Sequence, residues 1–568
     1  MSQNVVIIGA VALGPKAACR FKRLAPESRV IMVDQGNIIS YGGCGIPYFI
    51  SGDVSDPEQL QSTSFNMIRD EKFFRDVKDV DVMLHTRAVS IDRDRKTVLV
   101  RDVVSGEEQR LPYDRLVLAT GSRAGRLPVP GSDLAGVFTV SNMEEAIAIK
   151  KDIAGGKVGK AVIIGAGAIG LEMAEAMADL WGIETSVIEI ADQLLPGIIS
   201  GRMARMVQQH LKENGVSLYV SEKVERLEGD GRVARVVTDR RTLDADLVIM
   251  AVGVRPESDL ARDAGLEVSS SGAVVVNQRL QTSDPDIYAG GDCAQIRNLI
   301  TGKPGYYPLG SLANRQGRVI GTNLAGGDAR FEGAVGSFVM KLFEISVASS
   351  GLSLETAVKE GFDAVSAFVV QLDRAHFYPE KDVIYLELVV EKGTSRVLGI
   401  QGLGNTGDGV LARVSAVAGI LKHRPTTADI SNLELPYSPP FSSAMDILNA
   451  PGNTAENLLA GRNRKIDAWE FEEWWRNRKD GDVFFLDCRE RGNASPLVEK
   501  YPGQWNNIPQ GELRGRIKEV PRDRKIALVC NTGARSYEAQ LTLNRMGIEE
   551  AYNLQGGMAG LKKWGLEL

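Results

Sequence analysis

Short apolar runs alternate with helical segments along the first half of the chain. Val5–Ile8 is such a run, and the helical segment Pro15–Leu24 separates it from a second run, Arg29–Val33. The order returns with the run Ala161–Ile164 and the helical segment Leu171–Trp181. Continuous apolar runs of this length are typical of buried strands in a parallel sheet, with helices as the crossovers between them. The pattern predicts two βαβ units of the α/β class.

From about residue 331 the pattern changes to alternating strand-like runs and then a helical stretch. The runs are Val335–Leu342, Ala364–Leu372, Ile384–Val390 and Val397–Leu403, and the helical stretch is Asp408–Lys422. Pro451-Gly452-Asn453 and the polar run Gly461–Lys465 predict a boundary. Beyond it, an amphipathic helix at Trp469–Arg476 and strands at Val483–Leu486 and Ile526–Val529 predict another small α/β unit.

The turn after the first strand has glycines at its first and last positions, Gly9 and Gly14, and Asp34 ends the second strand. Such a turn cradles a pyrophosphate at the start of a helix, and an acid at this spacing holds a ribose hydroxyl. Two later strand ends, Leu116–Gly121 and Thr282–Asp292, complete a set that resembles the FAD-binding pattern of flavoproteins with two dinucleotide domains. The FAD-binding residues so predicted are Gly9, Ala12, Gly14, Asp34, Thr120, Gly121, Asp292 and Ala313.

A second nucleotide turn lies between these pieces. Residues 165–170 form a full G-x-G-x-x-G between strand and helix, and Glu189 lies near the end of the strand Glu184–Ile190. A carboxylate there accepts from a free ribose 2′-hydroxyl and repels a 2′-phosphate, which favours NADH over NADPH. The NAD-binding residues so predicted are Gly165, Gly167, Ile169, Gly170, Glu189 and Gly253. Two dinucleotide sites in one chain predict hydride transfer from NADH to FAD.

Two cysteines lie in segments that suit a reactive thiol. Cys44 is flanked by glycines, which let a flat ligand approach the sulfur, and no second cysteine lies near it to close an internal disulfide. Its oxidised form is therefore a mixed disulfide, a persulfide or a sulfenic acid. Cys530 ends a strand and precedes Asn531-Thr532-Gly533-Ala534-Arg535-Ser536, whose N–H groups favour a thiolate or persulfide. Arg535 adds positive charge, whereas Cys488 is expected to be a packing residue.

Bulk composition narrows the remaining choices. The 568 residues predict ~3–4 domains, and a net charge of −6 gives no indication of nucleic-acid or anionic-membrane binding. No apolar run approaches the ~18 residues of a membrane span, and Met1 leads directly into a strand. Five scattered cysteines form no CxxC pair, so we expect a reduced, cytoplasmic protein without a metal site.

The motifs identify a family resemblance that covers nearly the whole chain. Ser40-Tyr41-Gly42-Gly43-Cys44, followed by Gly-x-Pro-Tyr, resembles the active motif of coenzyme A-disulfide reductases among the pyridine nucleotide-disulfide oxidoreductases. Cys530–Ser536 resembles the Cys-x-x-Gly-x-Arg-Ser loop of a rhodanese domain. The resemblance is to fusions of the two, the class that includes NADH-dependent persulfide reductases. It implies two nested Rossmann-like domains, an α+β dimerisation domain and a rhodanese domain. The implied boundaries are 1–148 with 245–325 for FAD, 149–244 for NAD, 326–460 for dimerisation and 466–568 for rhodanese.

The resemblance also implies roles for individual residues. Cys44 is the redox thiol beside the flavin, and Tyr437 and Tyr378 act as paired tyrosines from the partner subunit of a homodimer. Phe377 stands where the family has a further tyrosine. Arg20, Lys22 and Arg23 of the first helix correspond to residues that bind coenzyme A phosphates.

The expected reaction passes two electrons from NADH through FAD to a mixed disulfide on Cys44. That disulfide forms from coenzyme A persulfide, polysulfide or coenzyme A disulfide, and Cys530 carries or delivers sulfane sulfur. One alternative is an NADH peroxidase or oxidase that passes through a Cys44 sulfenate. The other is a non-catalytic sulfur-relay or docking module.

Overall fold

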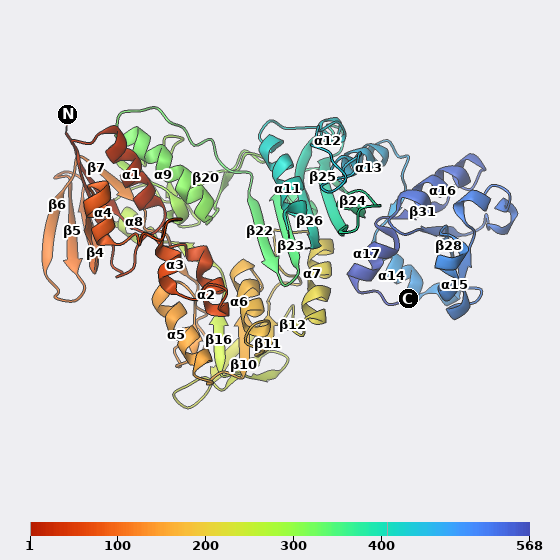
Figure 1. The fold of residues 1–568 in the computed structure, drawn as a ribbon, viewed down its shortest axis with the longest axis horizontal. Helices are drawn as coiled ribbons and strands as arrows, with labels where there is room; N and C mark the ends of the chain where they lie inside the picture. The colour runs from red at the N-terminus through yellow and green to blue at the C-terminus, as the bar shows by residue number, and fades with distance from the viewer. Residues whose placement is uncertain (1, 406) are drawn as a thin grey trace. The chain divides into compact units, whose positions relative to one another are not determined.

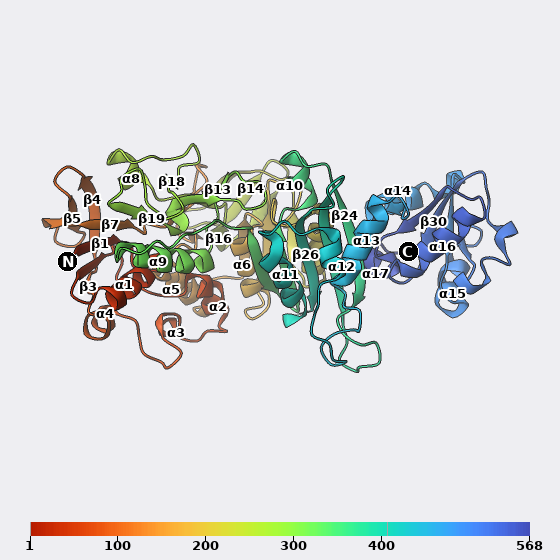
Figure 2. The ribbon, with the colours of Figure 1, turned by 90° about the horizontal axis from the view of Figure 1, so that it is seen from above.

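The computed structural model describes residues 2–405 and 407–568, and the chain divides into two compact units. The first unit comprises Met1–Asp192 and Gly215–Ala334, and the second comprises Gln193–Asn214 and Val335–Leu568. Figure 1 and Figure 2 give the order of the elements along the chain.

The first sheet of the first unit is parallel, with strand order β19-β7-β1-β2-β3. Its strands are β1 (Asn4–Ile8), β2 (Arg29–Val33), β3 (Asp81–Met83), β7 (Arg115–Leu118) and β19 (Ile287–Ala289). Alternate residues of β1 enter different cores: Val5 and Ile7 pack on one face of the sheet, Val6 and Ile8 on the other. Burial on both faces explains why the sequence shows an unbroken apolar run.

Helix α1 (Leu13–Leu24) crosses from β1 to β2 and packs against α9 (Gly310–Leu324), as both ribbon views show. Two glycines of α9 permit this close approach. A Cβ atom on Gly317 would lie 2.7 Å from the carbonyl oxygen of Leu13, and one on Gly321 would lie 2.6 Å from that of Ala17. The packing of α1 on α9 fixes which side chains of α1 face solvent.

A second parallel sheet has the order β12-β11-β10-β16-β9. Its strands are β9 (Val137–Phe138), β10 (Lys160–Ile164), β11 (Glu184–Ile188), β12 (Ser217–Tyr219) and β16 (Leu247–Met250). The predicted NAD-binding segment, 149–244, omits β9 and β16, so this sheet extends beyond both boundaries. Helix α6 (Ala168–Ala178) follows β10.

Smaller elements complete the first unit. They are α2 (Ile46–Ser51), α3 (Pro57–Gln61), α4 (Glu71–Lys78), β4 (Thr86–Asp92), β5 (Thr97–Asp102), β6 (Glu108–Pro112), β8 (Ser122–Ala124), α5 (Met143–Ala154), β13 (Val224–Glu228), β14 (Arg235–Thr238), β15 (Thr242–Asp244), β17 (Val254–Pro256), α8 (Asp259–Asp263), β18 (Val274–Val275), β20 (Ala294–Arg297) and β21 (Pro304–Gly305).

The second unit contains an antiparallel sheet of order β22-β23-β26-β25-β24. Its strands are β22 (Ser337–Leu342), β23 (Ile345–Gly351), β24 (Ala364–Leu372), β25 (Val383–Glu391) and β26 (Val397–Asn405). The sequence prediction missed β23. Helix α11 (Asp408–Leu421) packs on β23 and β26.

Three shorter helices accompany this sheet: α10 (Leu354–Lys359), α12 (Thr427–Ser431) and α13 (Asn449–Leu459). Pro451 and Gly452 lie in the first turn of α13. A proline fits the first turn of a helix because no hydrogen bond needs its missing N–H. Gly452 lets α13 approach α12, since a Cβ there would lie 2.7 Å from the backbone nitrogen of Ser431.

The C-terminal sheet is parallel, with order β27-β31-β30-β28-β29. Its strands are β27 (Lys465–Ile466), β28 (Val483–Asp487), β29 (Trp505–Asn507), β30 (Lys525–Val529) and β31 (Ala551–Leu554). Helices α14 (Ala468–Arg476), α15 (Arg491–Lys500), α16 (Ala534–Arg545) and α17 (Gly557–Trp564) accompany it (Figure 1). The predicted mixed α/β class, with two Rossmann-like sheets and a C-terminal α/β unit, is confirmed.

A buried arginine joins helix α7 (Gly201–Glu213) to this C-terminal part of the second unit. Arg202 forms ion pairs with Asp467 and, at 3.7 Å, with Glu387. Its guanidinium carbon lies 4.5 Å from the ring centre of Phe368 and 5.4 Å from that of Trp469. Burial alone would raise the pKa of Asp467, but the charges of Arg202 and Lys465 hold that pKa below its usual value. We call Arg202, Glu387 and Asp467 the arginine clasp.

Candidate active site

The two glycine-rich turns of the first unit have the same construction. Gly9 and Gly165 both have φ +105°, a conformation that favours glycine. A Cβ on Gly14 would lie 2.0 Å from the carbonyl oxygen of Gly9, and one on Gly170 would lie 2.0 Å from that of Gly165. Only glycine permits this approach between the strand end and the first helical turn.

Each turn is also held by the acid that the sequence analysis assigned to a ribose. The carboxylate of Asp34 accepts from the backbone nitrogen of Ala10 at 2.8 Å, and Glu189 accepts from that of Ala166 at 2.7 Å. Glu189 also accepts from the backbone nitrogen of Ala191 at 2.8 Å and is buried. These carboxylates therefore position the phosphate-binding turns in addition to any contact with a ribose.

The other predicted nucleotide residues lie at neighbouring strand ends. Ser122 donates to Asp292 at 3.2 Å, and Thr120 donates to the carbonyl oxygen of Glu257 at 2.5 Å. Burial raises the pKa of Asp292. The hydroxyl of Tyr306 is buried with no hydrogen-bond partner of good geometry among the described residues. A buried hydroxyl without such a partner, close to the carboxylate of Asp292, fits a site for a bound molecule that has polar groups of its own. The ribityl chain of FAD is such a group.

The other predicted nucleotide-binding residues make no side-chain hydrogen bond, and the structure gives their backbone conformation and burial. Gly121 and Gly253 have positive φ, Gly167 has open space where a Cβ would be, and Ile169 is exposed. Ala12 is half-buried at the start of α1, and Ala313 is buried in α9 within 3.6 Å of a Cβ position on Gly291.

Cys44 lies in a single turn, Gly43–Gly45, directly before α2, and is exposed. A side-chain carbon on Gly310, the first residue of α9, would lie 3.8 Å from the Cys44 sulfur. Neighbouring protein atoms partly withdraw the thiol from water and raise its pKa, and the carboxylates of Glu172 and Asp292 raise it further. The start of a long helix acts in the opposite sense, because its free N–H groups favour a thiolate.

A titratable residue that the sequence analysis missed lies near this thiol. Glu172, in the first turns of α6, lines a small pocket together with Tyr48 and Ser51 of α2. Burial, with a contribution from Glu175, raises the pKa of Glu172 to about 7. Burial and the charge of Glu172 also raise the pKa of Tyr48 to about 12. The sequence signal is an acid two residues after the last glycine of the second turn.

The basic residues of α1 divide into an outer and an inner group. Lys16 and Arg23 are exposed, and Arg20 lies half-buried between them and donates to the Thr322 hydroxyl at 3.0 Å. Positions four and three residues apart lie on one face of a helix, so these three cations form a single row.

Lys22 faces inward and does not belong to this row. It is 9% exposed, and its amine donates to the carbonyl oxygens of Pro26 and Ser28 at 2.8 Å and pairs with Asp79. The prediction that Lys22 binds coenzyme A phosphates is therefore wrong, because its donors are already used inside the protein. Lys16, in contrast, lies on the exposed face of α1 with Arg20 and Arg23.

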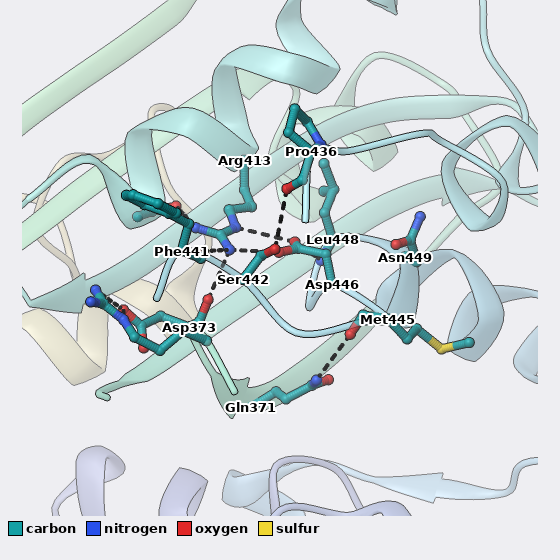
Figure 3. A network of polar contacts seen from close by, with 12 residues as sticks. Gln371, Asp373, Arg413, Pro436, Phe441, Ser442, Met445, Asp446, Leu448 and Asn449 are labelled. Atoms are coloured by element: carbon teal, nitrogen blue, oxygen red, sulfur yellow. Dashed lines mark hydrogen bonds and ion pairs between the residues drawn. The ribbon is translucent and has the colours of Figure 1, made fainter. Parts of the chain in front are cut away.

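In the second unit, one ion pair anchors the segments that carry both predicted tyrosines. Arg413 of α11 binds Asp446 at 2.5 Å and donates to the carbonyl oxygen of Asp373 at 2.9 Å, as Figure 3 shows. Arg413 also donates to the carbonyl oxygen of Phe441 at 3.4 Å. Residues 373–378 and 436–446 are thus tied to the same side chain.

These anchored segments present apolar side chains to the outside of the single chain. Tyr437 is 52% exposed, Phe441 74%, Met445 61% and Phe377 65%, whereas Tyr378 is half-buried. Leu435–Pro440 contains no helix or strand, in agreement with its prolines. Four large exposed apolar side chains on segments that are fixed internally are typical of an interface.

Cys530 lies between β30 and α16, at the carboxyl edge of the C-terminal sheet. Its sulfur accepts from the backbone nitrogen of Gly533 at 3.1 Å and from the Ser536 hydroxyl at 3.2 Å. Gly533 has φ +101°, which turns the loop around the sulfur. Arg535 is half-buried in the same loop. A backbone N–H group and a hydroxyl therefore both lie within hydrogen-bond distance of this sulfur.

The described residues contain no group of three or more His, Cys, Asp or Glu side chains that is arranged to hold a metal ion. Among the helices of the same described ranges, none is both long and apolar enough to cross a membrane.

Comparison with known proteins gives three family matches. Residues 3–317 match the pyridine nucleotide-disulphide oxidoreductase model, residues 338–448 the dimerisation domain of that family and residues 470–563 the rhodanese-like domain. A protein of Pyrococcus abyssi named NAD(P)H sulfur oxidoreductase (CoA-dependent) is 36% identical over 79% of this chain and 97% of its own length.

Two solved structures match nearly the entire chain. A NAD-dependent persulfide reductase from A. fulgidus has a TM-score of 0.92 at 38% identity and covers 98% of this chain and 99% of its own. Reduced CoADR-RHD from Bacillus anthracis has a TM-score of 0.90 at 32% identity and covers 99% of this chain and 98% of its own. Together with the two glycine turns, the isolated Cys44 and the Cys530 loop, these matches show that the chain belongs to the pyridine nucleotide-disulphide oxidoreductases and carries a C-terminal rhodanese domain.

Proposed function

We propose that this protein is an FAD-dependent NAD(P)H reductase of sulfur substrates linked to coenzyme A: its persulfide, its disulfide and polysulfide. The observation that carries the proposal is the combination, in one chain, of two nucleotide turns, a thiol with no disulfide partner at Cys44 and a second thiol cradled by donors at Cys530. Relatives named for CoA-dependent sulfur reduction support the same substrate class.

When bound, FAD supplies the two-electron transfer from the nicotinamide to sulfur. Cys44 attacks a sulfur–sulfur bond of the substrate, which leaves one sulfur fragment in a mixed disulfide and releases the other as a thiolate. The start of α9 favours the Cys44 thiolate, and the carboxyls of Glu172 and Asp292 oppose it.

The row formed by Lys16, Arg20 and Arg23 binds the phosphates of coenzyme A in this proposal. Three cations at helical spacing match a ligand with several phosphate groups. Lys22 lies outside this row and stabilises the end of α1 through its hydrogen bonds to Pro26 and Ser28.

The active enzyme is proposed to be a homodimer, with Tyr437 and Tyr378 serving the Cys44 site of the partner copy. Support comes from the match to a dimerisation domain and from the exposed side chains of Phe377, Tyr437, Phe441 and Met445. Their anchoring by Arg413 means that little conformational entropy is lost when a second copy packs against them.

For the nucleotide, we propose a preference for NADH over NADPH. Glu189 is buried and already accepts two backbone N–H groups, so it stays where a 2′-phosphate would meet its charge. We also propose a cytoplasmic location, because all five cysteines are free.

The test compares NADH oxidation with coenzyme A persulfide, polysulfide, coenzyme A disulfide and hydrogen peroxide, each at the same concentration. The proposal expects the sulfur substrates to give the higher kcat/KM and Cys44→Ser to abolish turnover of all of them. Cys19→Ser serves as the control, because Cys19 is a half-buried thiol in the same unit. A peroxide rate above every sulfur rate, or wild-type turnover by Cys44→Ser, would contradict the proposal.

A further inference from the structure

The cysteine that the sequence assigned to packing lies directly beside Cys530. Strands β28 and β30 run parallel, and their last registered pair is Asp487 with Val529. Cys488 and Cys530 are the next residues of these strands. The backbone nitrogen of Cys488 donates to the carbonyl oxygen of Val529 at 2.8 Å, so the ladder continues to this point. The two cysteines are therefore opposed across neighbouring strands.

Both side chains project to the same side of the sheet. Leu486, Cys488 and Leu528 belong to one core cluster, which also contains Ala539 and Leu543 of α16. Side chains alternate along a strand, so Cys530 shares the face of Leu528. Its sulfur accepts a hydrogen bond from Ser536 of α16, which agrees with this direction.

The separation suits a covalent bond between the two. Neighbouring strands lie about 4.8 Å apart, and disulfides join residues whose Cα atoms are about 4.4–6.8 Å apart. A charge on Cys530 is the strongest charge effect on Cys488 and raises its pKa beyond the increase that burial causes. Cys488 is 0% exposed and Cys530 is 1% exposed, so both thiols are buried in the protein and face each other rather than water.

We propose that Cys488 is a resolving cysteine, which forms a disulfide with Cys530 after an oxidant has converted Cys530 to a sulfenic acid. In the first step the Cys530 thiolate attacks hydrogen peroxide, the O–O bond breaks, and hydroxide leaves. In the second step the Cys488 sulfur attacks the Cys530 sulfur, the S–O bond breaks, and the oxygen leaves as water with the Cys488 proton. Peroxide is thereby reduced by two electrons, and the two thiols are oxidised to one disulfide.

The chemistry of Cys488 keeps this reaction out of ordinary turnover. A thiol with a raised pKa is a poor nucleophile at neutral pH, so it leaves a persulfide on Cys530 intact. A sulfenic acid condenses with a thiol readily, and the adjacent position replaces a bimolecular encounter. The disulfide protects Cys530 from irreversible oxidation to the sulfinic acid, and an external dithiol restores both residues. This inference does not depend on the substrate proposed above.

The test exposes the full-length protein to hydrogen peroxide, blocks free thiols and maps the peptides by mass spectrometry without reduction. The wild type is expected to give a peptide pair linked through Cys488 and Cys530, which dithiothreitol separates. In Cys488→Ala, Cys530 is expected to accumulate as the sulfinic acid about tenfold faster, because the neighbouring thiol no longer competes with a second peroxide. Cys19→Ala, which removes a cysteine of the other unit, should behave as the wild type.

Because Cys488 is fully buried, Cys488→Val provides a second variant that fills the site. Loss of protection in both variants, with unchanged tryptophan fluorescence, supports the proposal. A wild type that forms no such linkage, that pairs Cys530 with a different thiol, or that over-oxidises Cys530 as fast as the two variants would overturn it.

Discussion

The arginine clasp predicts a large loss of stability when its cation is removed. Arg202→Met keeps most of the side-chain length but leaves the buried carboxylate of Glu387 without its cation and leaves Asp467 with Lys465 alone. Breaking a buried ion pair in this way costs about 3–5 kcal/mol. The contacts with the rings of Phe368 and Trp469 add to this cost.

The assay can be directed at the rhodanese domain because five of the six tryptophans of the chain lie in it, at positions 469, 474, 475, 505 and 564. Urea unfolding followed by tryptophan fluorescence therefore reports mainly on this part of the protein. With a slope of about 1.5 kcal/mol per M, a loss of 3 kcal/mol lowers the midpoint by about 2 M.

Arg205→Met is the matched control. Arg205 lies one turn further along α7, is exposed, and its guanidinium is 5.9 Å from the ring centre of Trp564. Its replacement is expected to cost about 0.5–1 kcal/mol. Equal midpoints for the Arg202 and Arg205 variants would refute the reasoning.

Three further outcomes follow from the site. Because the pKa of Glu172 rises from 4.5 to about 7 on folding, the free energy of unfolding should fall as pH rises from 4.5 to 7 and stay lower above pH 7. Glu172→Gln should remove this fall. Urea unfolding should then show a variant that is about 2–3 kcal/mol more stable than the wild type at pH 8 but not at pH 4. Lys16→Ala should raise the KM for coenzyme A persulfide about tenfold with little change in kcat. Lys22→Met should lower thermal stability and leave this KM unchanged. The opposite pattern would contradict the orientation of α1. Arg413→Met should leave Asp446 buried without its cation and release the tyrosine segments, so sedimentation should show a dimer weakened by at least about tenfold.

The local pattern of the sequence was sufficient to predict the nucleotide turns, because each glycine serves a contact between neighbouring elements. The first prediction that failed concerned an orientation. Lys22 belongs to the stripe of α1 that also contains the buried Pro15 and Ala18, but its charge suggested an exposed position. The inward position of Lys22 is set by the turn before β2 and by Asp79, which lies 57 residues further along the chain.

Long-range pairing also explains what the sequence did not reveal about β16 and Cys488. The strand β16 joins the second parallel sheet although it follows the predicted NAD segment, since its neighbours are β10 and β9. Cys488 and Cys530 are 42 positions apart, and only the register of β28 with β30 makes them neighbours. Spacing along the chain carries no information about such a pair.

The location of α7 bears on how the gene for such a protein can be assembled. The chain passes from the first unit to the second at residues 192–193, returns at 214–215 and leaves again at 334–335. A fragment that stops at residue 334 would therefore carry α7 without its packing partners, and Met203, Met206, Val207 and Leu211 would face water. The dimerisation part therefore cannot be exchanged together with α7 at a single splice point. The rhodanese domain, in contrast, is joined to the rest of the second unit by one stretch of chain, so a gene fusion can add it without interrupting another domain.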